Sequence, residues 1–172
     1  YQYESDCDIL YPASCNPRIL TVGGITPYGK RVIHGKNMGS GSSSAYYSFI
    51  GSRYGAELDV VAPAVLIYTT DPSSTTGYDR DFNGTSAACA HVSAIAALIL
   101  SAHPDLTPDQ VVGIIEYTSK KISPDLYSYQ TDTLRPHGTW NEEMGYGLVD
   151  AGAAVQIADK ATRTTYLRNT VV

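Results

Sequence analysis

The sequence predicts an α/β fold of three layers, in which helices cover both faces of a mainly parallel sheet. Three short runs, at residues 19–22, 58–62 and 65–68, are apolar at most positions and do not alternate strictly between apolar and polar residues, as in strands that are buried on both faces. A long alanine-rich segment and two further helical segments follow these runs. Strands followed by helices favour a sheet that is packed between helices.

Each predicted strand is bounded by residues that interrupt a sheet. The first run is rich in β-branched side chains and ends at Gly23-Gly24. Pro63 separates the second run from the third, and its nitrogen carries no hydrogen for a sheet ladder. The second strand is therefore expected to break at Pro63.

Several segments are predicted to lack regular structure. Residues 1–18 contain turn-forming residues, and residues 35–55 are so rich in Gly, Ser and Tyr that they predict a long flexible surface loop. Residues 71–83 are polar and predict another loop, and residues 162–172 predict a tail. The folded part is expected to be a single unit over residues 1–161.

The segment 87–102 predicts a helix that is apolar on every side. Six of the residues between positions 87 and 97 are alanine. A helix that is apolar all round is usually buried in the core of a larger body. Three short strands supply too little cover for such a helix, so part of the sheet is expected to lie outside this chain.

Two shorter helices are predicted from their start signals. Thr107 is a preferred N-cap residue, Pro108 suits the first helical position, and Gln110 completes a capping box. This helix is expected to run to about residue 121. The last helix is expected to begin near Asp150, whose carboxylate favours a helix N-terminus, and to end at about residue 161.

The composition excludes several classes of protein. The chain has 172 residues, which is the length of one domain. With 43% hydrophobic and 17% charged residues, its composition is too apolar and too weakly charged for a disordered protein. The net charge is −5 and no basic run supplies a patch for nucleic acid. No membrane span is predicted, because His91, Ser93 and Ser101 interrupt the most apolar segment.

The cysteines and histidines leave the redox state open and predict no zinc site. Cys7 and Cys15 lie in a loop-like stretch, whereas Cys89 lies alone in the alanine-rich helix. One interpretation is a disulfide between Cys7 and Cys15, with Cys89 as a buried thiol. The alternative is three reduced thiols in a cytosolic protein. No histidine stands at ligand spacing from a cysteine pair.

The sharpest local feature is Asn83-Gly84-Thr85-Ser86, which leads into the alanine-rich helix. A serine at a loop-to-helix junction lies where free backbone N–H groups and the positive end of the helix dipole meet. Spacing alone favours Ser86 as an N-cap residue. The functional alternative is that its hydroxyl attacks a carbonyl while its own N–H stabilises the oxyanion.

Ser86 does not belong to a nucleophile elbow, and no residue of the same helix can act as its base. The elbow Gly-x-Ser-x-Gly is absent, because Ala88 stands where its second glycine would be. His91 lies five residues after Ser86, which is about 140° around a helix axis. A base for Ser86 must therefore come from elsewhere.

The residues around Ser86 resemble a known motif. Residues 83–92 read Asn-Gly-Thr-Ser-Ala-Ala-Cys-Ala-His-Val, which resembles the nucleophile motif Gly-Thr-Ser-x-Ala-x-Pro-His-Val of the subtilisin-like serine proteases, or subtilases. The resemblance covers residues 11–157 and indicates the C-terminal half of the subtilase catalytic domain. Five further segments occur in the order of that family: Tyr11-Pro12-Ala13, 19–23, 57–63, 107–111 and 145–151.

The resemblance implies a role for each residue of the motif. Ser86 would be the nucleophile that forms the acyl-enzyme, and its N–H would be one oxyanion donor. Thr85 would lie beside the oxyanion site, and the backbone of Asn83 and Gly84 would line the primed side of the substrate cleft. The chain would then belong to a serine endopeptidase, which hydrolyses peptide bonds and requires no cofactor.

The rest of the catalytic machinery would lie outside this chain. Family members carry the catalytic Asp and His and the oxyanion Asn upstream, so all three would precede Tyr1, where the sequence begins without Met or a signal peptide. His34 and His137 lie in the wrong segments to replace the base. The isolated chain is expected to be inactive without the N-terminal half. A further possibility is that the isolated chain forms an intertwined homo-oligomer, which would hide the sheet edge left open by the missing strands.

Three departures from the family motif keep a second function open. Ala90 replaces the proline of the motif, and Ala94 and Ala64 each replace a glycine. Peptide-bond hydrolysis is the first hypothesis, and the alternative is an inactive pseudoprotease or a peptide-binding module with the same fold.

The resemblance also carries three subsidiary expectations. Leu10 would lie near the floor of the primary specificity pocket and shorten it, although an ordinary loop leucine fits the sequence equally well. Asp59 and the carbonyls near Ala13 and Cys15 resemble a weak structural site for Ca²⁺ or Na⁺, whereas the alternative is a solvated aspartate. The family and the pair of Cys7 and Cys15 together predict an extracellular or periplasmic protein.

Overall fold

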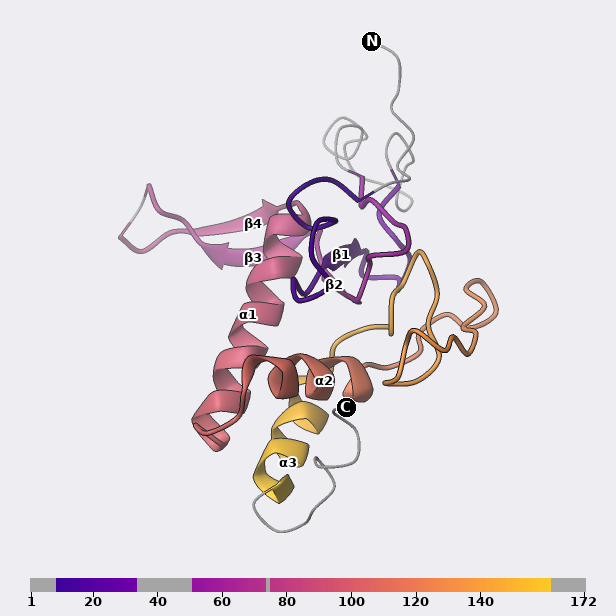
Figure 1. Cartoon of the computed structure of the whole chain (residues 1–172). Helices are drawn as coiled ribbons and strands as arrows, with labels where there is room; N and C mark the ends of the chain where they lie inside the picture. The colour runs from indigo at the N-terminus through magenta and orange to yellow at the C-terminus, as the bar shows by residue number, and fades with distance from the viewer. Residues whose placement is uncertain (1–8, 34–50, 74, 162–172) are drawn as a thin grey trace.

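The computed structural model describes residues 9–33, 51–73 and 75–161 (Figure 1). Most of the predicted loop 35–55, the predicted tail 162–172 and Cys7 lie outside the described residues. In the described part of the chain, strands precede helices. The elements are β1 (Val22–Ile25), β2 (Val60–Pro63), β3 (Ile67–Thr70), β4 (Tyr78–Phe82), α1 (Thr85–Ala102), α2 (Pro108–Thr118) and α3 (Ala151–Ala161).

β1 and β2 form a parallel pair, as predicted, with Val22 beside Val60. β1 begins three residues later than the predicted strand and includes both glycines of the predicted stop. A Cβ atom on Gly24 would lie 2.5 Å from the Cβ of Ala64, so this strand needs glycine for close packing. β2 ends at Pro63, which confirms the predicted break.

The segment before α3 continues the parallel pairing on the side of β2. The Val61 N–H donates to the Gly147 carbonyl (2.9 Å), and the Val149 N–H donates to the Val61 carbonyl (3.1 Å). Val61 and Leu148 thus form a parallel bridge. The inner part of the sheet is parallel, as the apolar runs predict.

β3 and β4 form an antiparallel hairpin that extends away from the parallel pair and the helices (Figure 1). The predicted loop over residues 71–83 is wrong for residues 78–82, which form β4. All five residues of β4 are exposed, so the strand has no buried apolar face that would mark it in the sequence. Tyr68 and Tyr78 stack across the hairpin with ring centroids 5.2 Å apart.

Within this chain α1 is buried on one side and exposed on the other, so its burial on every side in a larger body stays a prediction. It packs on β1, β2, α2 and α3. Leu98 and Leu100 remain 51% and 39% exposed, which agrees with the expected shortage of cover. By length and hydropathy alone α1 is apolar enough to span a membrane, and its buried share is 28%. The buried residues are Ala87, Ala88, Val92, Ile95 and Ile99.

α2 begins at the predicted capping box. The Thr107 hydroxyl accepts from the Gln110 N–H (3.3 Å), and the Gln110 side-chain oxygen accepts from the Thr107 N–H (2.9 Å). The helix ends at Thr118, three residues earlier than predicted. Lys120 instead forms an antiparallel bridge with Leu148, so a tertiary contact ends this helix.

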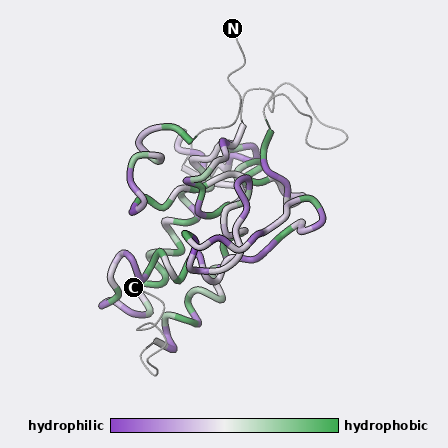
Figure 2. The backbone as a smooth tube through the Cα atoms, turned by 45° about the vertical axis from the view of Figure 1, so that its right-hand side comes forward, coloured by the Kyte–Doolittle hydropathy of each residue, from purple (hydrophilic) through white to green (hydrophobic). Residues whose placement is uncertain are grey.

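α3 has the predicted bounds, and Asp150 has the predicted role. One carboxylate oxygen of Asp150 accepts from the Ala153 N–H at 3.0 Å, as an N-cap residue does. In Figure 2 apolar stretches recur along the helices, and the peripheral loops contain both hydrophilic and hydrophobic stretches. The main core joins the inner faces of the helices to the parallel strands, and it includes Val60, Ala62, Val92, Ile99, Ile114, Ile115 and Tyr146.

Candidate active site

Ser86 is the second residue of α1 and is exposed to solvent. The N-cap residue of α1 is Gly84, with φ 131° and ψ 157°, and no side chain caps this helix end. The interpretation of Ser86 as the N-cap residue is therefore wrong. Such a backbone conformation is open essentially to glycine alone, which explains the glycine two residues before Ser86.

The start of α1 supplies electrostatic stabilisation for a negative charge. The first N–H groups of a helix have no partner within the helix, and the dipole places about half a positive charge there. The first turn of α1 contains no acidic residue that would neutralise this end. An oxyanion beside Ser86 would thus meet the Ser86 N–H and a favourable dipole.

Asn83 holds the loop before α1 in place with its side chain. Its carbonyl oxygen accepts from the Leu66 N–H (2.8 Å), and its amide nitrogen donates to the Asp81 carbonyl (2.6 Å). The Gly84 N–H donates to the Ala64 carbonyl just after β2 (2.7 Å). The loop is thus fixed to the carboxyl end of the parallel pair.

Thr85 packs over β1, at a contact that the sequence does not predict. A Cβ atom on Gly24 would lie 3.3 Å from the methyl group of Thr85, so the absence of a side chain at Gly24 lets the two elements approach. The Gly24 N–H donates to the Ser52 hydroxyl at 2.8 Å. In the sequence, the pair Gly23-Gly24 indicates the end of a strand. In the structure both glycines lie within β1, and Gly24 leaves room for the side chains of Ala64 and Thr85.

The histidines in the described part of the chain lie at three different places. A ring nitrogen of His91 lies 2.8 Å from the Ala87 carbonyl of its own helix. His137 pairs with Glu116 of α2, with a nitrogen-to-oxygen distance of 2.5 Å. His103 is the C-cap residue at the far end of α1. His34 lies outside the described residues.

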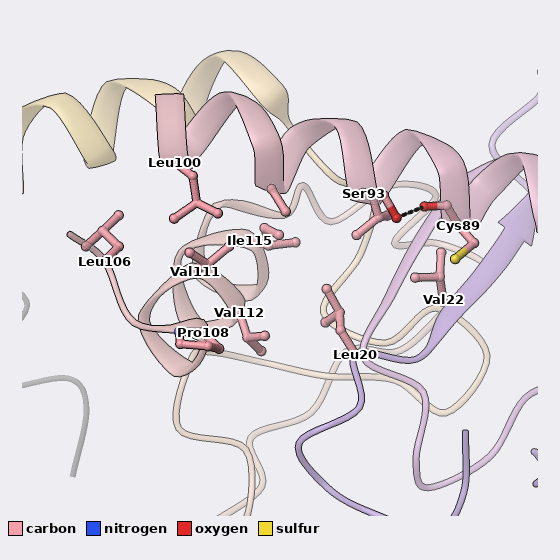
Figure 3. Close-up of a pocket in the computed structure, with 12 residues that line it drawn as sticks. Leu20, Val22, Cys89, Ser93, Leu100, Leu106, Pro108, Val111, Val112 and Ile115 are labelled. Atoms are coloured by element: carbon pink, nitrogen blue, oxygen red, sulfur yellow. Dashed lines mark hydrogen bonds between the residues drawn. The ribbon is translucent and has the colours of Figure 1, made fainter. Parts of the chain in front are cut away.

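An open apolar groove of about 360 Å³ lies between α1, α2 and the residues that lead into β1 (Figure 3). The residues of the candidate active site do not line it. The hydroxyl of Ser93 in this groove donates to the Cys89 carbonyl at 3.0 Å. Cys89 is exposed here, so the prediction of a buried thiol is wrong. The groove is lined by Leu20, Val22, Cys89, Val92, Ser93, Ala96, Leu100, Leu106, Pro108, Val111, Val112 and Ile115.

The remaining predictions around the site have mixed outcomes. Leu10 is 57% exposed, and its place at a specificity pocket stays a prediction. Cys15 is exposed and its thiol is free, while the proposed partner Cys7 lies outside the described residues. Ala90 and Ala94 are both exposed on α1, so their methyl groups meet no obstacle in the described chain.

Comparison with known proteins decides the family. The sequence model of the subtilase family, peptidase S8, matches residues 2–147. The chain belongs to the subtilase family. This family of serine peptidases is the one that the residues around Ser86 resemble.

Several curated subtilases are similar to this chain. Subtilisin DY from Bacillus licheniformis is 37% identical over 105 residues, which are 61% of this chain and 31% of the relative. Subtilisin E from Bacillus subtilis (strain 168) is 39% identical over 115 residues, with 67% and 25% covered. An extracellular basic protease from Dichelobacter nodosus is 32% identical over 158 residues, with 87% and 21% covered. This subtilase chain thus spans a third or less of the length of these relatives.

Solved structures show the same fold. A crystal structure of MycP1 from Mycobacterium smegmatis has a TM-score of 0.57 and 26% identity, and covers 86% of this chain and 32% of that protein. A protease from Pseudoalteromonas arctica has a TM-score of 0.55 and 30% identity, with 86% and 38% covered. The predicted α/β fold of subtilisin type is thereby confirmed.

Proposed function

We propose that this chain is the nucleophile-bearing C-terminal portion of a subtilisin-type serine endopeptidase, and that Ser86 forms the acyl-enzyme. The observation that carries the proposal is the exposed Ser86 at the second position of α1. There the hydroxyl is not needed to cap the helix, and the backbone N–H groups of the first turn have no helical partner. The fixed backbone of Asn83, Gly84 and Thr85 would bind the substrate alongside.

The proposed reaction is acyl transfer to Ser86 and then to water. Ser86 Oγ attacks the peptide carbonyl carbon while a histidine takes its proton, and the carbonyl oxygen becomes an oxyanion. The Ser86 N–H and an asparagine side chain donate to that oxyanion. The histidine gives its proton to the leaving amine, and water then releases the acyl group from Ser86. These steps require no cofactor.

The histidine, its aspartate and the oxyanion asparagine would come from an N-terminal half of the catalytic domain. Two of the described histidines support this view, because the His91 ring bonds to its own helix and the His137 ring pairs with Glu116. Loss of one oxyanion donor alone costs about 2.7–4 kcal/mol of barrier. Without the base as well, this chain by itself would be essentially inactive.

The exposed apolar face of α1 would pack against that N-terminal half. Leu98 and Leu100 are too exposed for a helix of this composition, and the apolar groove beside α2 continues the same surface. An isolated chain would hide this face in a homo-oligomer. Size-exclusion chromatography with light scattering tests this: we expect a mass above that of one chain, and a monomer would contradict it.

The decisive experiment is labelling of the full-length protein with a fluorophosphonate, which reacts with activated serine hydroxyls. We expect an adduct on the wild type and none on Ser86→Ala. Ser93→Ala is the matched control, because Ser93 is also an exposed serine of α1 but donates to its own helix. This control should label like the wild type. A wild-type protein without an adduct would favour the pseudoprotease or peptide-binding module instead.

The full-length protein would be extracellular or periplasmic. Its similar proteins include an extracellular basic protease and MycP1, which is described as a component of a type VII secretion system. Cell fractionation of the source organism with an antibody against this chain tests the location. Protein found only in the cytosolic fraction would contradict it.

A further inference from the structure

The carboxylate of Asp59 is buried at the amino ends of β1 and β2, and the residue is 8% exposed. One of its oxygens accepts from the Thr21 N–H at 2.7 Å. The other accepts from the Arg135 guanidinium at 3.1 Å. Both oxygens of this buried anion are thus bound by donors of the chain itself.

The guanidinium of Arg135 makes three contacts at this place. Besides Asp59, it donates to the Ala56 carbonyl, and it lies 4.6 Å from the centre of the Trp140 ring, as in a cation–π contact. The loop that carries it is closed by paired hydrogen bonds between Gln130 and Trp140 (2.8 and 2.9 Å). The side chain of Arg135 is 17% exposed, so this charge is held in a largely buried position.

A metal ion at this place would need oxygens that are already engaged. Carboxylate and carbonyl oxygens are the ligands of hard cations such as Ca²⁺. Arg135 donates to one Asp59 oxygen and to the Ala56 carbonyl. The Thr21 N–H donates to the other Asp59 oxygen, and the Ala13 carbonyl accepts from the Thr21 hydroxyl at 3.2 Å. A fixed guanidinium also repels a second cation. The residues of the predicted Ca²⁺ or Na⁺ site therefore do not fit a metal ion while Arg135 is in place.

We propose that Arg135 is the resident cation of this site and takes the place of a hard metal ion beside Asp59. Arg135 lines a pocket of about 370 Å³ between the segment that contains Ala13 and Cys15 and its own loop. It supplies the positive charge that a buried carboxylate requires. It also links that loop to the start of both parallel strands. Removal of the guanidinium opens a site that accepts Ca²⁺ or Na⁺.

The test compares thermal unfolding midpoints of the full-length protein with Ca²⁺, with Na⁺ and with a chelator. Arg135→Met keeps most of the apolar stem and removes the charge. We expect its midpoint with chelator to fall by about 5–10 °C, and Ca²⁺ or Na⁺ to raise it more than in the wild type. This extra rise should vanish in the double variant Arg135→Met/Asp59→Asn. Differences between variants cancel the effect of any other cation site.

Arg80→Met is the matched control, since Arg80 is an exposed arginine that also lies over an aromatic ring, 5.7 Å from the centre of Tyr68. It should respond to Ca²⁺ like the wild type. An Arg135→Met protein with no extra rise overturns the proposal. If Arg135→Met does not fold, the Ca²⁺ response of the unfolding midpoint is compared instead between the wild type and Asp59→Asn. An unchanged Ca²⁺ response supports the proposal, and a smaller one shows a metal ion already at Asp59 and overturns it.

Discussion

The two ends of the β1–β2 pair differ in how their polar groups are used. At the carboxyl end, the Ala64 carbonyl and Gly84 fix a loop by backbone contacts, and the Ser86 hydroxyl next to it is exposed. At the amino end, Asp59 and Arg135 are largely buried and bind one another. Ligands of open α/β sheets bind at the carboxyl ends of the strands. The carboxyl end thus leaves a hydroxyl accessible to a ligand, whereas the amino end uses its polar groups to hold distant segments together.

The largest expected effect is on the open end. Ser86→Ala in the full-length protein should lower kcat by about 10⁶-fold, because the nucleophile is lost. The unfolding midpoint should stay within about 1 °C, since exposed positions contribute little to stability. Peptidase assays and calorimetry on the same sample check both. A large fall in the midpoint would break the comparison.

The closed end should show the opposite pattern. Asp59→Ala leaves the buried Arg135 charge without its carboxylate, and the free energy of unfolding should fall by about 3–5 kcal/mol. Labelling of Ser86 by a fluorophosphonate should persist below the unfolding midpoint, because the substitution lies at the other end of the strands. Denaturant titration and labelling measure the two effects. Loss of labelling by a folded Asp59→Ala protein would show that the ends are coupled.

The same carboxylate should make stability depend on pH. Burial, opposed by the Thr21 and Arg135 hydrogen bonds, raises the pKa of Asp59 from 3.8 to about 6. The folded state therefore holds this proton more tightly than the unfolded state, and stability falls as the pH rises from about 4 to about 6, by about 3 kcal/mol. The difference between wild type and Asp59→Asn isolates this group. If the unfolding free energies of the wild type and Asp59→Asn change with pH in the same way, Asp59 is not the group responsible.

The smallest expected effect concerns the packing of Gly24 against Ala64 and Thr85, at the carboxyl end of the parallel pair. Gly24→Ala would place a Cβ atom 2.5 Å from that of Ala64 and 3.3 Å from the Thr85 methyl group. We expect a loss of about 1–3 kcal/mol from overpacking and a fall in kcat, because the loop before Ser86 shifts. Gly152→Ala in α3 is the matched control, with its nearest contact at 3.4 Å. It should be neutral or stabilising by up to about 1 kcal/mol.

Local signals in the sequence are sufficient for some elements. Thr107, Pro108 and Gln110 predict the start of α2 and its capping box, and Asp150 predicts the start of α3. Such caps depend on hydrogen bonds between residues three positions apart. By contrast β4 escapes prediction, because an exposed polar strand carries no hydrophobic period. The predicted end of α2 is misplaced because Leu148, distant in the sequence, pairs with Lys120.

The candidate site is predictable in part for the same reason. The residues from Asn83 to Ser86 are contiguous, so their pattern is visible in the sequence. The structural role of each residue in the motif is not visible in the sequence. Spacing favours Ser86 as the N-cap residue, whereas Gly84 is the N-cap residue in the structure. The anchoring of Asn83 to Leu66 across 17 positions is a product of the hairpin.

The sequence by itself indicated the family through the motif around Ser86. It also determined the starts of α2 and α3 and the position of the serine at the head of an alanine-rich helix. These features depend on backbone torsions and hydrogen bonds within a few residues. The tertiary structure alone decided that Arg135 meets Asp59, 76 positions earlier, and that Gly24 makes room for Thr85. The physical reason is that charge pairing and close packing depend on which distant segments the fold brings within a few ångströms.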